Sequence, residues 1–216
     1  AGAFFYLAKP FEQAMLIAIV SAAVRKGLKH REFLNDIVRQ TRSIQSMQSG
    51  MFRVRTIDEV HDLSILLANS CPDPEKIVMG LNDLLINAVE HGNLGITYDE
   101  KTSLQETEQW AQEVQRRLSL SENTHKYVEV NYERRDGKIH MVITDQGKGF
   151  DWKKYEEFSP EMALASHGRG IAMAKALCFD HLEYQGIGNQ VCCVVNAQAS
   201  AMLKGNRVKD SERACI

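Results

Sequence analysis

Cysteine and histidine are too few and too scattered in this sequence to suggest a disulfide framework or a metal site. The five cysteines stand at positions 71, 178, 192, 193 and 215, and no two have the two-residue spacing of zinc or redox motifs. The seven histidines contain no His-x-x-x-His pair. We therefore expect reduced thiols, no dedicated zinc site and a cytoplasmic protein.

Long hydrophobic runs and an excess of one charge are also missing. The longest apolar run, Ala14 to Val24, is too short to cross a bilayer, and its flanking residues do not follow the order of a signal peptide. With 26 basic and 28 acidic residues, the chain lacks the concentrated positive field of a nucleic-acid or membrane-surface binder. We therefore expect neither nucleic acid nor membrane as a partner.

Proline is absent from residues 11–47, and glycine occurs there once, at Gly27. Apolar or small residues recur from Leu16 to Ile44 at gaps that alternate between four and three, which is the spacing of a coiled-coil seam. The sequence therefore predicts a long N-terminal helix over residues 11–48. Two interpretations stay open: the seam forms a homodimer, or one amphipathic helix packs on its own chain.

Shorter patterns follow from residue 51 onward. An Asp-Gly pair at Asp136 and Gly137 predicts an antiparallel hairpin between two alternating runs. Asp58 is the predicted N-cap of a short helix, and Gly92 is predicted to stop a second one. The expected strands are 51–55, 127–132, 138–144, 182–185 and 191–196, and the expected helices are 58–68, 75–91 and 171–177.

A polar, mostly acidic stretch interrupts these patterns between Asp99 and Glu122. One helical pattern within it, around Trp110, Val114 and Leu118, predicts an inserted helix flanked by loops and packed through Trp110. Residues 203–216 form a polar tail that we expect to be frayed.

Three segments carry residues suited to binding chemistry. Asp83, Asn87 and His91 are four residues apart on the second predicted helix, so they share one face, although that face could equally be a plain solvent face. Asp145 ends a predicted strand, where its carboxylate can accept a hydrogen bond from an exocyclic amine. Gly147 and Gly149 follow it and let the backbone turn sharply toward a ligand, although simple turn chemistry is the alternative.

The third segment, residues 166–171, opens a predicted helix with two glycines, Gly168 and Gly170. Exposed backbone N–H groups at a helix N-terminus favour phosphate. The sequence contains neither a GxxxxGK[ST] phosphate loop nor a GxGxxG dinucleotide fingerprint, so the two commonest nucleotide-binding motifs are excluded.

Together, Asp83-x-x-x-Asn87-Ala88-x-x-His91-Gly92, Asp145-x-Gly147-x-Gly149-Phe150 and Gly168-Arg169-Gly170-Ile171 resemble the three ATP-binding boxes of the Bergerat-type ATPases. This superfamily includes gyrase, MutL and the sensor histidine kinases, and the Asn-Ala-x-x-His-Gly form is similar to its anti-sigma-factor serine kinase branch. The resemblance covers residues 51–198. With the element pattern, it implies an α+β two-layer sandwich: a mixed, mainly antiparallel sheet with helices on one face, preceded by the long N-terminal helix.

The resemblance also implies a role for each matching residue. Asn87 would bind the Mg²⁺ that bridges the ATP triphosphate, and Asp145 would bind the adenine amino group. Asp83 takes the general-base position, where the branch usually has the longer Glu. The remaining cofactor-binding residues implied are His91, Gly147, Gly149, Gly168, Arg169 and Gly170, beneath a lid over about residues 151–166.

Two further positions depart from the patterns of the superfamily. The Thr of its closing hairpin is replaced here by Asn189 or Gln190. Histidine kinases usually carry Lys three positions after the metal-binding Asn, where this sequence has Glu90. The missing Thr and the short Asp83 favour nucleotide binding over efficient catalysis, and Glu90 argues against the histidine kinase branch.

Residues 1–11 carry a second resemblance. Ala1-Gly2-Ala3-x-x-Tyr6-Leu7-x-Lys9-Pro10-Phe11 looks like the last strand and loop of a two-component receiver domain. This implies that residues 1–10 are the remnant of an upstream receiver and that the long helix is a signalling rod. The alternative is a disordered amino terminus. Residues 30–35, beginning at His30, partly resemble the phosphoacceptor box of histidine kinases, but the second helix of the required hairpin is missing.

We therefore expect an ATP- and Mg²⁺-binding output domain of a bacterial response regulator. It would phosphorylate a serine or threonine of a regulatory partner protein, similar to a sigma-factor antagonist, or sequester that partner. The alternatives are a catalytically weak, nucleotide-dependent binding switch and a histidine kinase catalytic domain.

Overall fold

The computed structural model describes residues 16–17, 20–21, 23–24, 43–152 and 169–197. The chain divides into two compact units, Ala1–Ser43 and Ile44–Ile216. In the first unit, residues 16–17, 20–21 and 23–24 are helical. The predicted receiver remnant, most of the long helix with His30, and the polar tail lie outside the described residues, so these stay predictions. No helix in the described ranges is long and apolar enough to cross a membrane.

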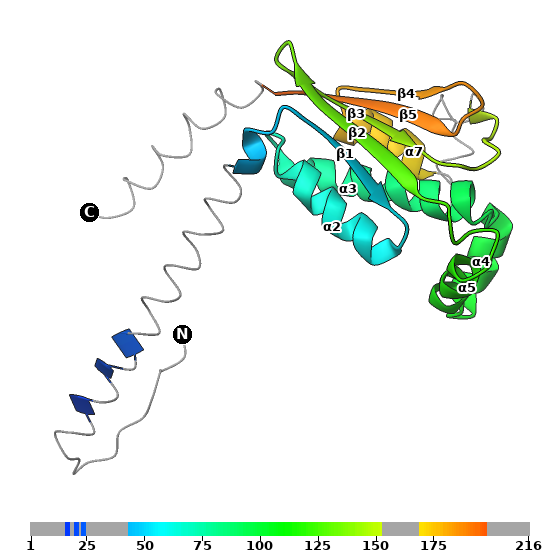
Figure 1. Ribbon diagram of the computed structural model, residues 1–216, viewed down its shortest axis with the longest axis horizontal. Coiled ribbons are helices and arrows are strands. Elements are labelled where there is room, and N and C mark those ends of the chain that lie inside the picture. Colours follow the sequence, from blue (N-terminus) through cyan, green and yellow to red (C-terminus); the bar gives the residue numbers. More distant parts are fainter. Residues whose placement is uncertain (1–15, 18–19, 22, 25–42, 153–168, 198–216) are drawn as a thin grey trace, which may run out of the picture. The chain divides into compact units, whose positions relative to one another are not determined.

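The second unit is built on a five-stranded sheet in the order β1-β2-β3-β5-β4 (Figure 1). Its strands are β1 (Ser49–Val54), β2 (Val128–Arg135), β3 (Lys138–Thr144), β4 (His181–Gln185) and β5 (Gln190–Asn196). The four pairings among them are all antiparallel, where the sequence predicts a mixed, mainly antiparallel sheet. Tight turns join β2 to β3 and β4 to β5, and a tight turn can join only antiparallel neighbours.

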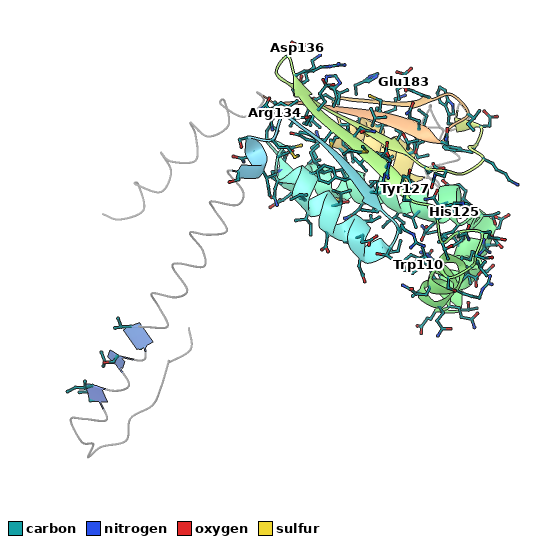
Figure 2. The ribbon with its side chains drawn as sticks, viewed as in Figure 1. Trp110, His125, Tyr127, Arg134, Asp136 and Glu183 are labelled. Atoms are coloured by element: carbon teal, nitrogen blue, oxygen red, sulfur yellow. The ribbon has the colours of Figure 1, made fainter. Side chains whose placement is uncertain are left out.

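The turn between β2 and β3 is the predicted Asp-Gly turn. Asp136 (φ 52°) and Gly137 (φ 72°) both have positive φ, as a type I′ turn requires, and Asp136 lies at the tip of the hairpin (Figure 2). The register places Arg135 opposite Lys138 and Glu129 opposite Thr144. This register turns alternate side chains of both strands toward the helices.

The helices cover one face of the sheet (Figure 1). They are α2 (Ile57–Ala68), α3 (Pro74–Asn87) and α7 (Arg169–Met173); a π-helical turn, η1 (Ala88–Asn93), extends α3, and another, η3 (Ala174–Cys178), extends α7. Val130, Met141 and Cys193 from the sheet pack with Leu81 and Leu85 of α3 in one core, and all five are fully buried. The predicted α+β architecture, with helices on one face, is confirmed.

The N-cap of α2 is Thr56 and not Asp58, the residue predicted from the sequence. The Thr56 hydroxyl accepts a hydrogen bond from the backbone N–H of Glu59 (3.2 Å), and the Glu59 carboxylate accepts one from the Thr56 N–H (3.0 Å). This reciprocal capping box satisfies two backbone donors at once, whereas Asp58 lies inside the first turn, where its charge favours the helix dipole.

The insert contains two helices, α4 (Tyr98–Glu106) and α5 (Trp110–Leu118), where one was predicted. Thr97 and Glu100 form a second capping box, which begins α4. Glu108 has a φ of 55°, a left-handed conformation that separates the two helices. Trp110 packs against the core, as predicted, and Figure 2 shows it at these helices.

Candidate functional site

A cavity of about 870 Å³ lies between the end of the α3–η1 helix, the loop after β3 and the β4–β5 hairpin. Five of the residues predicted for the site line it: Asn87, His91, Asp145, Gly147 and Gly149. Because these come from two segments far apart in the sequence, their convergence is a result of the tertiary fold. Gly168 lies outside the described residues, and Arg169 is the first residue of α7.

The closest approach in the site is between the helix end and the loop after β3. A Cβ atom added to Gly92 would lie 2.4 Å from Cγ of Asp145, and one added to Gly147 would lie 2.3 Å from the Gly92 carbonyl oxygen. Contacts this short are not possible for real Cβ atoms, so both positions require glycine. From the sequence, Gly92 is predicted only as a helix stop and not as a site residue, although it is part of the motif that carries the resemblance.

The α3–η1 helix ends in the π-helical turn η1. The backbone N–H of Leu94 donates to the Val89 carbonyl (2.9 Å), five residues back. Such π-bulges widen one turn and are frequent at functional sites. The widened turn carries His91, Gly92 and Asn93 from the helix to the loop after β3. Asn93 Oδ1 then accepts a hydrogen bond from the Gln146 N–H (2.8 Å).

Asp145 is the most strongly perturbed carboxyl group among the described site residues. Burial raises its pKa to about 6, opposed by the Gly147 N–H, which donates to Oδ1 (2.8 Å). Asn189 holds the Asp145 backbone on both sides: its carbonyl accepts from the Asp145 N–H (2.9 Å) and its Nδ2 donates to the Asp145 carbonyl (3.1 Å). Among the described residues no hydrogen bond reaches Oδ2, so this oxygen can accept one from a neutral donor on a ligand.

Asn189 and Gln190 both line the cavity at the position expected for the superfamily Thr. Gln190 Nε2 donates to the Thr144 hydroxyl (3.1 Å), across from it in the β3–β5 register. Of these two residues, Asn189 is the one that hydrogen-bonds Asp145, and it positions the Asp145 backbone. Both residues are candidates from the sequence, and these hydrogen bonds together with the β3–β5 pairing separate them.

His91 forms part of the cavity wall in its neutral form. Its Nδ1 donates to the Ile96 carbonyl, its ring lies 4.3 Å from the Tyr98 ring between centroids, and burial lowers its pKa. With the proton on Nδ1, Nε2 is an acceptor, and this buried atom has no hydrogen-bond partner among the described residues. His91 thus fixes the helix-to-insert connection and presents a flat aromatic wall.

Two more aromatic side chains line the cavity. Phe150 and Tyr184 line the cavity, with ring centroids 5.2 Å apart in an edge-to-face arrangement. A pocket with aromatic walls and one buried carboxylate fits a flat heterocycle that carries an amino group. The sequence analysis did not include Tyr184, because nothing local distinguishes it from other strand residues of the closing hairpin.

Asp83 lies one turn before Asn87, outside the set of residues that line the cavity. A Cβ atom on Gly170 would lie 3.6 Å from its Oδ2, in van der Waals contact, so the start of α7 lies beside this carboxylate. Partial burial raises the pKa of Asp83, and the Lys101 ammonium opposes that rise. Asp83 and Gly170 are therefore neighbours outside the set of residues that line the cavity.

The protein groups near Asp83 suit a magnesium ion held mainly by a ligand. No cluster of three or more His, Cys, Asp or Glu side chains able to hold a metal occurs in the described ranges. Mg²⁺ is typically held by one or two protein oxygens together with phosphates and water. The Asn87 carboxamide oxygen, one turn from the Asp83 carboxylate, matches that requirement.

Comparison with known families agrees with this geometry. The model of the histidine kinase-like ATPase domain matches residues 55–195. The chain belongs to this family. No curated protein matches the chain with significant similarity. The histidine kinase-like ATPase match includes both insert helices and all the cavity residues named above, and family membership implies nucleotide binding, typically with Mg²⁺.

Proposed function

We propose that the domain binds ATP with Mg²⁺ and transfers the γ-phosphoryl group to a serine or threonine of a regulatory partner protein. The observation that carries this proposal is the convergence of Asp145, Gly92, Gly147 and Asn87 on one cavity. An adenine ring fits the aromatic end and a polyphosphate fits the helix face beyond it.

Each residue has a distinct task in this proposal. Asp145 Oδ2 accepts a hydrogen bond from the adenine amino group, while Gly92 and Gly147, which leave no space for side chains between them, hold the carboxylate in place. Asn87 provides an oxygen ligand for Mg²⁺, which neutralises charge that develops on the phosphates. Gly170, at the start of α7, lies beside Asp83, where the third motif would contact the γ-phosphate.

Asp83 is the general base of the proposed transfer. It accepts the proton of the partner hydroxyl, whose oxygen forms the new bond to phosphorus. The bond between the γ-phosphorus and the bridging oxygen breaks, and ADP leaves with that electron pair. Because Asp is one methylene shorter than Glu, the partner hydroxyl must approach the helix more closely than in relatives with Glu.

A second candidate function is a nucleotide-dependent binding switch without efficient turnover. The observation that favours it is the solvent-accessible position of the short Asp83 outside the cavity lining. In this case the nucleotide sets the conformation that holds or releases the partner, and phosphorylation of a receiver domain upstream biases that conformation. The receiver, the homodimer through residues 11–48 and the sigma-factor-antagonist-like partner all rest on sequence resemblance and spacing.

One experiment separates these functions. The protein is incubated with γ-labelled ATP and Mg²⁺, with candidate partners, and ATP affinity is measured in parallel by calorimetry with and without Mg²⁺. Label on a partner serine or threonine supports the kinase, and tight binding without label transfer supports the switch. Label on His30 would instead support a histidine kinase. An absence of any ATP binding at millimolar concentration contradicts the nucleotide-binding proposal.

A further inference from the structure

The insert brings two side chains to a buried carboxylate on the site helix. Glu90, in η1, is fully buried, and it accepts hydrogen bonds from the Lys101 ammonium (2.5 Å) and from the Trp110 indole N–H. Lys101 belongs to α4 and Trp110 begins α5. A fully buried carboxylate is costly unless it is paired and hydrogen-bonded, so these donors fix both insert helices to η1.

Two more contacts hold the insert against the end of η1. Arg117 Nη1 donates to the carbonyls of Leu94 (3.2 Å) and Gly95 (3.0 Å), and Lys126 Nζ donates to the Asn93 carbonyl (2.8 Å). Cations favour the C-terminal ends of helices, where carbonyl groups lack intrahelical partners. The insert is therefore anchored at several points, and the position of Lys101 follows from these contacts.

Glu90 is three residues after Asn87 and seven after Asp83, so these three side chains share one face of the helix, and the ammonium group bound to Glu90 lies at that face. Lys101, like Asp83, is outside the set of residues that line the cavity. Its charge acts to lower the pKa of both Asp83 and His91, so the ammonium group lies near both side chains. Among the described residues Lys101 donates to Glu90 alone, and its side chain is 21% exposed. An ammonium group has three N–H donors, so two remain available to an anion.

We propose that Lys101 is a phosphate-binding residue supplied by the insert, with its ammonium group contacting the polyphosphate of the nucleotide beside Asn87. This inference rests on the proposed nucleotide-binding function. Glu90 then has a positioning role: it holds the ammonium over the helix face before the nucleotide arrives. On this face the α3–η1 helix supplies only acidic and amide groups, at positions 83, 87 and 90. The insert thus supplies the positive charge for the phosphates.

The test compares ligands that differ only in phosphate. Affinities for ATP, ADP and adenosine are measured by calorimetry for the unaltered protein and for Lys101→Met. We expect ATP affinity to fall about 10-fold or more, ADP affinity to fall less, and adenosine affinity to change less than about 2-fold. Lys101→Arg keeps the charge and should retain most of the ATP affinity. Lys138→Met, at an exposed lysine in β3, is the matched control and should bind all three ligands normally.

A second variant controls for destabilisation of the fold, because Lys101→Met leaves Glu90 buried without its counter-ion. In the double variant Lys101→Met with Glu90→Gln the buried charge is gone, and the Gln oxygen still accepts from Trp110. The same selective loss for ATP in this variant supports the proposal. An equal loss for all three ligands, or no loss, overturns it. If the unaltered protein binds none of them, the nucleotide-binding function itself fails, a result distinct from failure of the Lys101 assignment.

Discussion

The Cβ position of Gly147 lies 2.3 Å from the carbonyl oxygen of Gly92, so the loop after β3 and the end of η1 touch through their backbones. The Asp145 side chain fills the space beside Gly92, and any side chain on that glycine would displace it. The cavity beside Asp145 therefore depends on two residues that contribute no functional group.

Gly92→Ala should remove nucleotide binding and destabilise the fold. The added methyl group would lie 2.4 Å from Asp145 Cγ, which forces the carboxylate out of place. Overpacking of this kind costs about 1–3 kcal/mol. The measurements are urea unfolding and ATP calorimetry.

Gly186→Ala is the control. Gly186 has a φ of 58° with open space around it, so its alanine variant should lose some stability and keep its ATP affinity. Normal ATP affinity in Gly92→Ala would contradict the described packing.

Asp145→Asn should stabilise the ligand-free protein at pH 8 while weakening nucleotide binding. The Asp145 pKa of about 6 lies above its ordinary value, so the fold favours the protonated carboxyl. That favourable contribution is complete below about pH 4 and is lost as the pH rises through 6. We expect a gain of about 1–3 kcal/mol in the free energy of unfolding at pH 8, and little change at pH 4.

Chemical unfolding of the two proteins at both pH values checks this expectation. Asp136→Asn, at an exposed carboxyl in the β2–β3 turn, serves as control and should leave the free energy of unfolding unchanged. A loss of stability at pH 8 in Asp145→Asn would show that the ionised carboxylate makes favourable contacts in the ligand-free protein.

Affinity for adenosine should rise with pH and level off above about pH 7. The exocyclic amine needs an ionised acceptor, and Asp145 is largely protonated below its pKa. At pH 5 the affinity should be about 10-fold lower than at pH 7. Adenosine is chosen because it lacks phosphate groups that titrate in this range. Calorimetry from pH 5 to 8 gives the profile, and a flat profile would remove Asp145 from contact with the base.

Asp83→Asn should abolish phosphoryl transfer and leave ATP affinity within about 2-fold. A general base contributes about 10²- to 10⁴-fold to a rate, whereas Asp83 does not line the cavity. Asp83→Glu restores the side-chain length that is usual in the serine kinase branch that the sequence resembles. This variant should therefore transfer phosphate at least as fast as the unaltered protein. Transfer to the partner is followed with labelled ATP, and equal rates in Asp83→Asn would exclude the assigned base.

Residues close in sequence determined the local structure almost completely. The Asp136-Gly137 turn and its two strands follow from turn chemistry and alternation, and the four-residue spacing of Asp83, Asn87 and His91 follows from the helix period. The capping residues were harder to predict, because Thr56 and Asp58 are both good N-caps and the choice depends on which one Glu59 can complete as a capping box.

Only the tertiary structure decided how these pieces meet. Nothing near Glu90 in the sequence indicates burial, yet it is fully buried, because the insert brings Lys101 and Trp110 to it. The contact between Gly92 and Gly147 likewise depends on how η1 packs against the loop after β3. Periodicity and capping act within about one turn of chain, so the sequence alone determined the elements and the candidate residues. Burial and close approach depend on the packing of distant segments, which is why the cavity itself required the fold.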